Sequence, residues 1–206
     1  MQPDPAGAAP AAFAPLAEIN ELALELLARR AGGEPARLPP MLRESRELWC
    51  SLGAAQRRRL AGCPFLLLDI SLAGFADAPA GGSEGVRDTG GDEWWAAGAP
   101  LPRLAYLTLT YAWHLAQTRP LAARVVLGLS DDSCAWFAKL GLRELGECAE
   151  SCLRSLRPRW SDSPAVWRHL LTAAASSEPT EFELARLRGM QLLAARHWPA
   201  DPGRPR

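Results

Sequence analysis

The chain contains 206 residues, 48% of them hydrophobic and 22% charged, which suits one globular domain, or one domain with a small appendage, and is too apolar for a disordered chain. Lys plus Arg and Asp plus Glu both total 23, and the resulting net charge of zero excludes a free-standing polycation that binds nucleic acid by bulk charge. No segment reaches the roughly 18 apolar residues that a membrane span needs, so no membrane partner is expected.

Five scattered cysteines form no Cys-x-x-Cys pair, and the N-terminal residues lack the basic and apolar regions of a secretory signal. An odd number of isolated thiols without such a signal predicts reduced cysteines in a cytoplasmic protein. Cys148 and Cys152 lie four residues apart on one predicted helix and could share a metal ion. A structural zinc needs about four ligands, and His169 and Cys134 could be added only by assumption, so we expect buried thiols and no metal.

The N-terminal part of the chain, residues 16–75, has the apolar periodicity of helices. Residues 1–15 precede it, are rich in proline and alanine, and are expected to form a flexible segment. Apolar residues at three- and four-residue steps predict a helix over residues 16–31, ended by a Gly-Gly pair. A second helix should begin at the next Pro-Pro pair and be interrupted at Gly53, with a further short turn after it.

The most apolar run of the chain covers residues 63–72. It predicts a buried helix, because Ile70 is its only β-branched residue and no partner strand is evident elsewhere. Asp69 lies within this run and needs a partner if it is interior. Residues 76–102, rich in glycine and proline, predict a loop that divides the chain into two helical parts.

The C-terminal part, residues 103–198, carries clear helix signals, and residues 199–206 are expected to form a flexible tail. Gly128 should end one helix, Ser130 should cap the next, and Thr180 begins a predicted capping box. The sequence therefore predicts an all-α fold, a bundle of about seven to nine helices without significant sheet. The expected C-terminal helices span residues 104–118, 120–127, 131–140, 143–156, 164–175 and 180–196.

Eight tryptophans are many for a chain of this length. Four lie in predicted helices and are expected in the core, whereas four lie near helix ends or loops. An aromatic side chain in the second setting can either anchor a partner or pack locally. The first group is Trp49, Trp113, Trp136 and Trp167, and the second is Trp94, Trp95, Trp160 and Trp198.

No catalytic constellation stands out. A nucleophilic cysteine needs an electropositive setting, whereas Cys134 lies in a first helical turn beside Asp131 and Asp132, which oppose a thiolate. No carboxylate pair is evident, and the glycines of residues 81–91 lack the lysine of a phosphate-binding loop. We therefore expect a protein that is not an enzyme, with no catalytic residues, no cofactor and no small-molecule substrate.

A cluster of arginines surrounds a predicted junction between two helices. Arginine interleaved with aromatic residues is typical of nucleic-acid contact, and a helix start adds amides that favour phosphate. Residues 101–206 carry 14 basic and 10 acidic side chains, and this positive net charge is expected if this half of the chain binds an anion. The alternative is that the arginines form a solvated basic face. The residues predicted to contact nucleic acid or a partner are Arg154, Arg157, Arg159, Trp160 and Arg168.

Several short segments in residues 104–171 form a recognisable order. They are Leu109-Thr110-Tyr111, Leu115-Ala116-Gln117, Ala122-Ala123-Arg124, Leu127-Gly128-Leu129-Ser130, Leu140-Gly141-Leu142-Arg143-Glu144-Leu145 and Arg157-Pro158-Arg159-Trp160-Ser161-Asp162. Together they resemble the flagellar transcriptional activator family of FlhD type, with its Leu-Ser-Tyr and Ala-Gln helix and the alanine-bearing helix that ends in Leu-Gly. Residues 1–100 and the last helix have no counterpart in that shorter family, and another bacterial helical family sharing this core is the alternative.

The resemblance implies a helical regulator that oligomerises and contacts promoter DNA together with a second subunit. We therefore predict a transcription-regulator-like protein that forms a homo-oligomer, or a complex with another regulator, and shares DNA binding. The alternative is a non-enzymatic helical adaptor or scaffold with no nucleic-acid role. The regulator predicts a projection with basic, solvent-facing residues between about 130 and 168, whereas the adaptor predicts an exposed apolar groove or patch lined by tryptophan.

Overall fold

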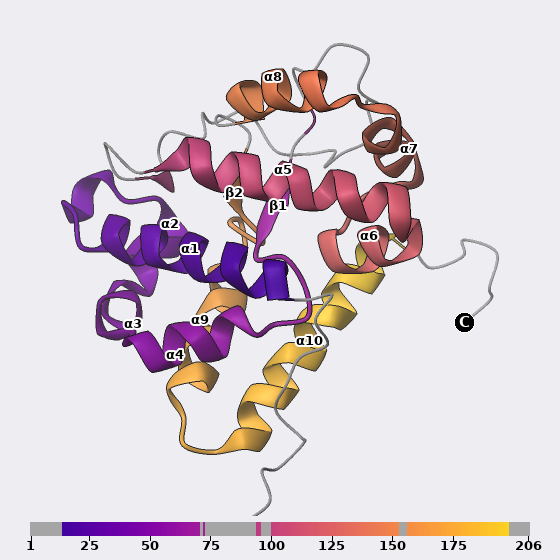
Figure 1. The fold of residues 1–206 in the computed structure, drawn as a ribbon. Helices are drawn as coiled ribbons and strands as arrows, with labels where there is room; N and C mark the ends of the chain where they lie inside the picture. Colours follow the sequence, from indigo (N-terminus) through magenta and orange to yellow (C-terminus); the bar gives the residue numbers. More distant parts are fainter. Residues whose placement is uncertain (1–13, 71, 73–93, 96–99, 153–155, 198–206) are drawn as a thin grey trace, which may run out of the picture.

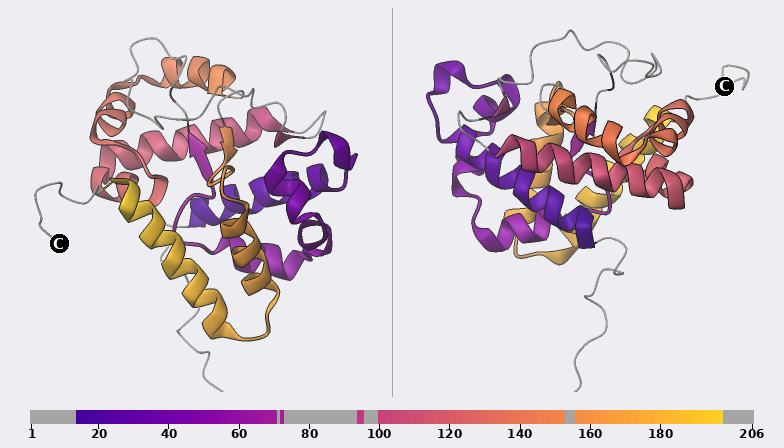
Figure 2. Two further views of the ribbon diagram at one scale, coloured as in Figure 1. Left: turned by 180° about the vertical axis from the view of Figure 1, so that it is seen from behind. Right: turned by 45° about the horizontal axis from the view of Figure 1, so that its top comes forward.

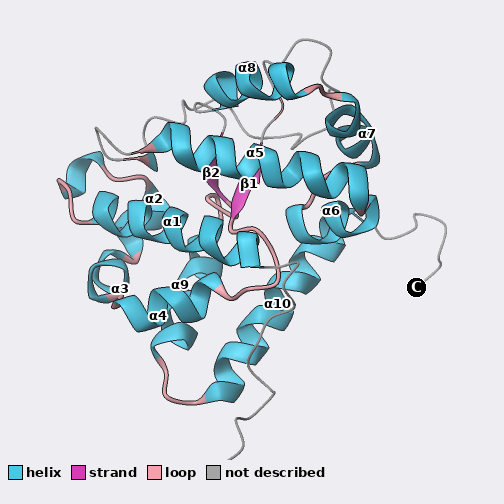
Figure 3. Ribbon diagram, viewed as in Figure 1, coloured by secondary structure: helices cyan, strands magenta, loops and turns pink. Residues whose placement is uncertain are grey.

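The computed structural model describes residues 14–70, 72, 94–95, 100–152 and 156–197 (Figure 1). Within these residues the chain forms ten α-helices, one short 3-10 helix and a two-stranded sheet, as Figure 3 shows. The predicted all-α fold is therefore confirmed. None of the described helices is long and apolar enough to cross a membrane. The predicted loop at 76–102 lies largely outside the described residues, as do most of the two predicted flexible ends.

The N-terminal helices begin and end close to the predicted positions. The first helix ends at the predicted Gly-Gly pair, and the second predicted helix is divided in two at Ser45. The elements are α1 (Ala14–Ala31), the 3-10 helix η2 (Pro35–Arg37), α2 (Pro40–Glu44), α3 (Arg46–Ser51) and α4 (Ala54–Ala61).

The C-terminal helices follow the capping signals of the sequence. Gly128 ends one helix with a φ of 70°, and the Ser130 side chain accepts a hydrogen bond of 3.1 Å from the Ser133 amide, so both predicted signals are confirmed. The last helix begins before Thr180, so Thr180 is not its N-cap. The helices are α5 (Leu101–Thr118), α6 (Pro120–Leu127), α7 (Asp131–Lys139), α8 (Leu142–Cys152), α9 (Pro164–Ala175) and α10 (Pro179–His197).

The apolar run at residues 63–72 is not a helix, which corrects the prediction. It crosses the interior in extended form and ends in strand β1 (Leu68–Ile70), which pairs antiparallel with β2 (Leu156–Pro158). The partner strand occupies the end of a predicted helix, since α8 ends at Cys152 instead of Leu156. In Figure 2 the two strands lie in the middle of the molecule.

Asn20 of α1 satisfies backbone groups of this extended segment. Its fully buried side-chain amide donates to the carbonyl oxygens of Ala61 (3.3 Å) and Phe65 (3.0 Å) and accepts a hydrogen bond from the Leu67 amide (2.9 Å). The Leu66 amide donates in turn to the carbonyl of Val126 at the end of α6 (2.9 Å). These bonds replace those that a helix would have made, so an extended chain can be buried here at little cost.

One hydrophobic core joins the two parts of the chain. The long helix α5 lies between α8 on one side and α1 on the other (Figure 1), and α9 packs against α2, α3 and α4. The rings of Trp49 and Trp167 meet with centroids 5.1 Å apart, one tryptophan from each part. Arg59 of α4 adds a polar link, because its guanidinium donates to the Ser176 carbonyl beyond the end of α9 and lies 4.9 Å from the centre of the Phe182 ring.

Two helical glycines provide a matched test of this packing. A Cβ atom at Gly189 of α10 would overlap the Phe65 ring, whereas a Cβ at Gly146 of α8 would meet nothing within 4 Å. We expect Gly189→Ala to lower the free energy of unfolding by about 1–3 kcal/mol through overpacking. Gly146→Ala should raise it by about 0.4–1 kcal/mol, because the unfolded chain loses freedom. Urea denaturation measures both; equal effects would contradict the contact between α10 and Phe65.

Candidate functional site

Arg159 lies in the interior, at the point where three elements meet. Its side chain is 1% exposed, and its Nη2 donates to the carbonyl oxygens of Leu68 in β1 (2.9 Å) and Leu127 in α6 (2.6 Å). Its Nε lies 3.6 Å from Oδ1 of Asp69. Asp69 therefore has the partner that its place in an apolar run required.

Trp160 is also buried, and it follows Arg159 with a positive φ of 53°. Its ring packs edge-on against Phe65, with centroids 5.6 Å apart. A bulky residue in this backbone region is strained, so the surrounding packing must hold it there. The Trp167 indole nitrogen donates to the Arg159 carbonyl (2.5 Å), which fixes the same turn from the α9 side.

The predicted arginine cluster is thus divided between interior and surface, which corrects the expectation that Arg159 and Trp160 contact a partner. Arg157 lies in β2 opposite Asp69 and is half-buried. Arg168 of α9 is exposed, and its Nη2 lies 3.5 Å from Oε2 of Glu44. Arg154 lies outside the described residues. The described members of the cluster, Arg157, Arg159, Trp160 and Arg168, therefore do not form one exposed basic surface.

The substitution Arg159→Met tests the interior role. It removes both hydrogen bonds to backbone carbonyls and leaves Asp69, whose side chain is only 18% exposed, without this cation. Loss of one partner of such a buried pair costs about 3–5 kcal/mol of stability. The matched variant Arg168→Met removes an exposed pair and should cost about 1 kcal/mol or less. Denaturation midpoints compare the two; equal losses would show that Arg159 does not act as a structural bridge.

Three of the described thiols, Cys63, Cys134 and Cys148, lie in settings that suppress their reactivity. Burial raises the pKa of Cys63 to about 12 and that of Cys134 to about 11. Burial and then the neighbouring Glu144 and Glu147 raise the pKa of Cys148. Within the described part of the chain, no group of three or more His, Cys, Asp and Glu side chains is placed to hold a metal ion. Nothing is described of the Cys152 side chain, so the predicted absence of a metal site stays a prediction.

Thiol labelling near pH 8 tests these environments. The exposed Cys50 should react first, whereas Cys63 should react only when the chain unfolds. Because the folded-state pKa of Cys63 lies above its ordinary value of 9.0, this thiol's contribution to stability is complete below pH 9 and is lost as the pH rises through about 12. Cys63→Ala should flatten the decline in stability over that range. Equal labelling rates for Cys50 and Cys63 in the folded chain would contradict the burial.

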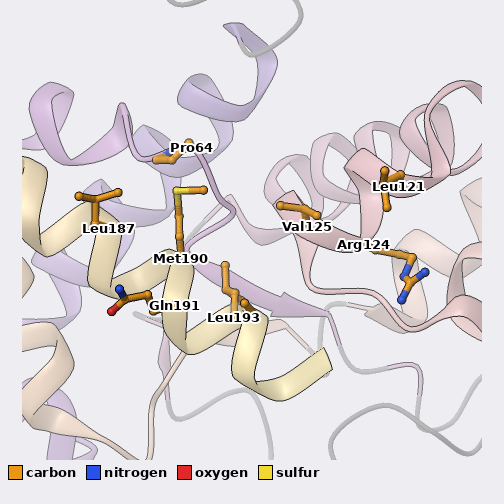
Figure 4. Close-up of a pocket in the computed structure, with 9 residues that line it drawn as sticks. Pro64, Leu121, Arg124, Val125, Leu187, Met190, Gln191 and Leu193 are labelled. Atoms are coloured by element: carbon orange, nitrogen blue, oxygen red, sulfur yellow. The ribbon is translucent and has the colours of Figure 1, made fainter. Parts of the chain in front are cut away.

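A concave apolar surface lies between α6 and α10. It is an apolar groove of about 350 Å³, and Pro64 of the extended segment lies at one end. In Figure 4 the Met190 side chain reaches toward Pro64, and Val125 stands on the opposite wall. We call it the α6–α10 groove. It is lined by Pro64, Leu121, Arg124, Val125, Leu187, Met190, Gln191, Leu193 and Ala194.

Exposed apolar side chains gather around this groove. Of the seven large apolar residues exposed in the described part of the chain, five belong to α6 and α10. Among the described lining residues Arg124 is the only charged one, and it pairs with Asp131 at 2.8 Å. The described walls of the groove are therefore chemically suited to apolar side chains. The five residues are Leu121 (65% exposed), Val125 (49%), Leu184 (63%), Leu187 (54%) and Met190 (40%).

The sequence held a signal for this surface. One face of α10 is buried and includes Phe182 and Ala185, three residues apart. A second face of the same helix carries Leu184 and Leu187, which are also three residues apart but are exposed. A helix with two apolar faces needs a second neighbour for the outer one. The predicted tryptophan lining is wrong for this groove, since its walls carry leucine, valine and methionine. Described tryptophans such as Trp94 and Trp95 are buried instead.

Comparison with protein-family models, with curated proteins and with solved structures finds no match. The resemblance of residues 104–171 to FlhD-type activators therefore stays a prediction, and the function has to be argued from the geometry.

Proposed function

We propose that this chain is a non-enzymatic helical adaptor that binds a protein through the α6–α10 groove. The observation that carries the proposal is the convergence of four exposed apolar side chains, Leu121, Val125, Leu187 and Met190, on one groove of about 350 Å³. Soluble proteins rarely leave such side chains together in water unless the patch serves an interaction. Full burial of a Leu, Val or Met side chain contributes about 1.5–3 kcal/mol, so a few of them can support specific association.

The exposure of the walls favours a protein over a small molecule. A small-molecule site encloses most of its ligand, whereas Leu121 and Leu187 remain more than half exposed at the rims of this groove. Paired helices with apolar residues at three- and four-residue steps suit an amphipathic helix laid between them. The groove therefore fits a helical segment that contributes one or two apolar side chains.

The regulator hypothesis shares the protein-association part of this proposal. Its DNA-binding part stays a prediction, since Arg159 is committed to backbone carbonyls and Arg168 faces Glu44. Lys139 and Arg143, earlier in the chain, are exposed, but Arg143 pairs with Glu147 at 3.3 Å. The adaptor accordingly has the stronger support.

Affinity capture from the native cell, with and without nuclease, tests the proposal. Val125→Glu and Leu187→Glu place charges in the groove, and Leu142→Glu changes an exposed leucine of α8, 74% exposed and not part of the groove. We expect both groove variants to lose the same captured proteins by at least about tenfold, because burying an unpaired carboxylate is costly. The α8 variant should retain them, and nuclease should not release them.

Two outcomes would contradict the adaptor. If nuclease releases the captured proteins, the association depends on nucleic acid and the regulator hypothesis takes its place. If the groove variants and the α8 variant lose partners equally, the groove is not the binding surface. Circular dichroism of each variant confirms that the helices persist.

A further inference from the structure

We propose that the outer face of α10, which forms one wall of the α6–α10 groove, packs against the same face of a second copy of this chain, so that two copies associate about a two-fold axis with their α10 helices antiparallel. This inference rests on the proposed function and names the partner of the same site. It is carried by the outer face of α10 and by two unpaired charges beside it.

The outer face of α10 forms one wall of the groove, and beyond the groove it continues as a ridge of exposed side chains that includes Leu184. Leu184, Leu187, Gln191 and Ala194 follow one another at steps of three, four and three residues, which is the spacing of a two-helix seam. Leu184 is 63% exposed and lies one turn before the lining residues, so it belongs to the ridge and not to the groove. A surface that holds both a ridge and a groove can complement a copy of itself.

Two exposed charges flank this face. Glu181 and Arg188 are seven residues apart, so they lie on the same side of α10. Neither has an ion pair among the described residues, whereas their neighbours Glu183 and Arg186 pair with each other at 2.7 Å. Among the described residues, one acid and one base are therefore left without an ion pair along the edge of this apolar face.

The positions of these charges select the second copy and its direction. A two-fold axis across the seam reverses α10, so the acidic start of one helix lies along the basic middle of the other. Glu181 of each copy then meets Arg188 of the other, giving two equivalent ion pairs. Parallel helices related by a two-fold axis along the seam would instead place Glu181 against its own counterpart. With Glu181 opposite Arg188, the two-fold axis passes between residues 184 and 185, so Leu184 of each copy lies beside Leu184 and Leu187 of the other.

Sedimentation of the purified full-length chain at about 1–100 µM provides the test. We expect a dimer that Leu184→Glu converts to a monomer and that the α8 variant Leu142→Glu leaves intact. Glu181→Arg and Arg188→Glu should each raise the dimer Kd at least about tenfold, because each replaces two ion pairs with two like-charge contacts. An equimolar mixture of these two variants should form a heterodimer with wild-type affinity, since every acid again faces a base.

The results that would overturn the inference are distinct from those against the adaptor. A wild-type chain that is monomeric throughout, a dimer insensitive to Leu184→Glu, or a mixture that fails to recover affinity each excludes the antiparallel α10 pair. If such a chain still loses captured partners on Leu187→Glu, the groove binds a different protein and the adaptor stands. Circular dichroism and the denaturation midpoint of every variant separate loss of association from loss of folding.

Discussion

The interaction on which this fold most depends is the buried guanidinium of Arg159. It joins β1 to the end of α6 through the carbonyls of Leu68 and Leu127, and it lies beside Asp69. The carbonyls at a helix end and the edge of a two-stranded ribbon have few partners of their own, so a buried fork of donors is a physical requirement there. The Asn20 side chain likewise forms hydrogen bonds with backbone groups of the residues that precede β1.

The helices could be predicted because their signals are local. Glycine and proline breaks, the Ser130 cap and apolar steps of three and four residues place most of them within a few residues. The extended segment could not be predicted, because its stability comes from groups distant in sequence. Leu66 donates to Val126, and the Arg159 amide donates to Leu67, 92 residues away in the chain. No local pattern reports such a pairing, and a leucine-rich run without β-branched residues favours a helix.

The candidate site shows the same contrast between local sequence signals, which could be interpreted, and contacts between distant segments, which could not. Asp69 signalled its need for a partner, but the arginine that meets it had been grouped with surface residues because of its neighbours in sequence. Side chains close in sequence, such as Arg159 and Arg168, need not share a surface when one follows a strand and the other lies on a helix. The groove was missed for the opposite reason, because its walls come from α6 and α10, about 65 residues apart. The second apolar face of α10 was visible but had no evident neighbour.

Pro64 gives the groove a property that its lining residues alone would not supply. It directly precedes residues whose backbone groups bond to the Asn20 side chain and to the Val126 carbonyl, and one wall, α6, is tied at its end to Arg159. Pro64 and the α6 wall are therefore both connected to a hydrogen-bonded part of the interior. A binding surface of this kind is preorganised, so little conformational entropy is lost when a partner binds to it. A small contact area can therefore be enough for measurable affinity.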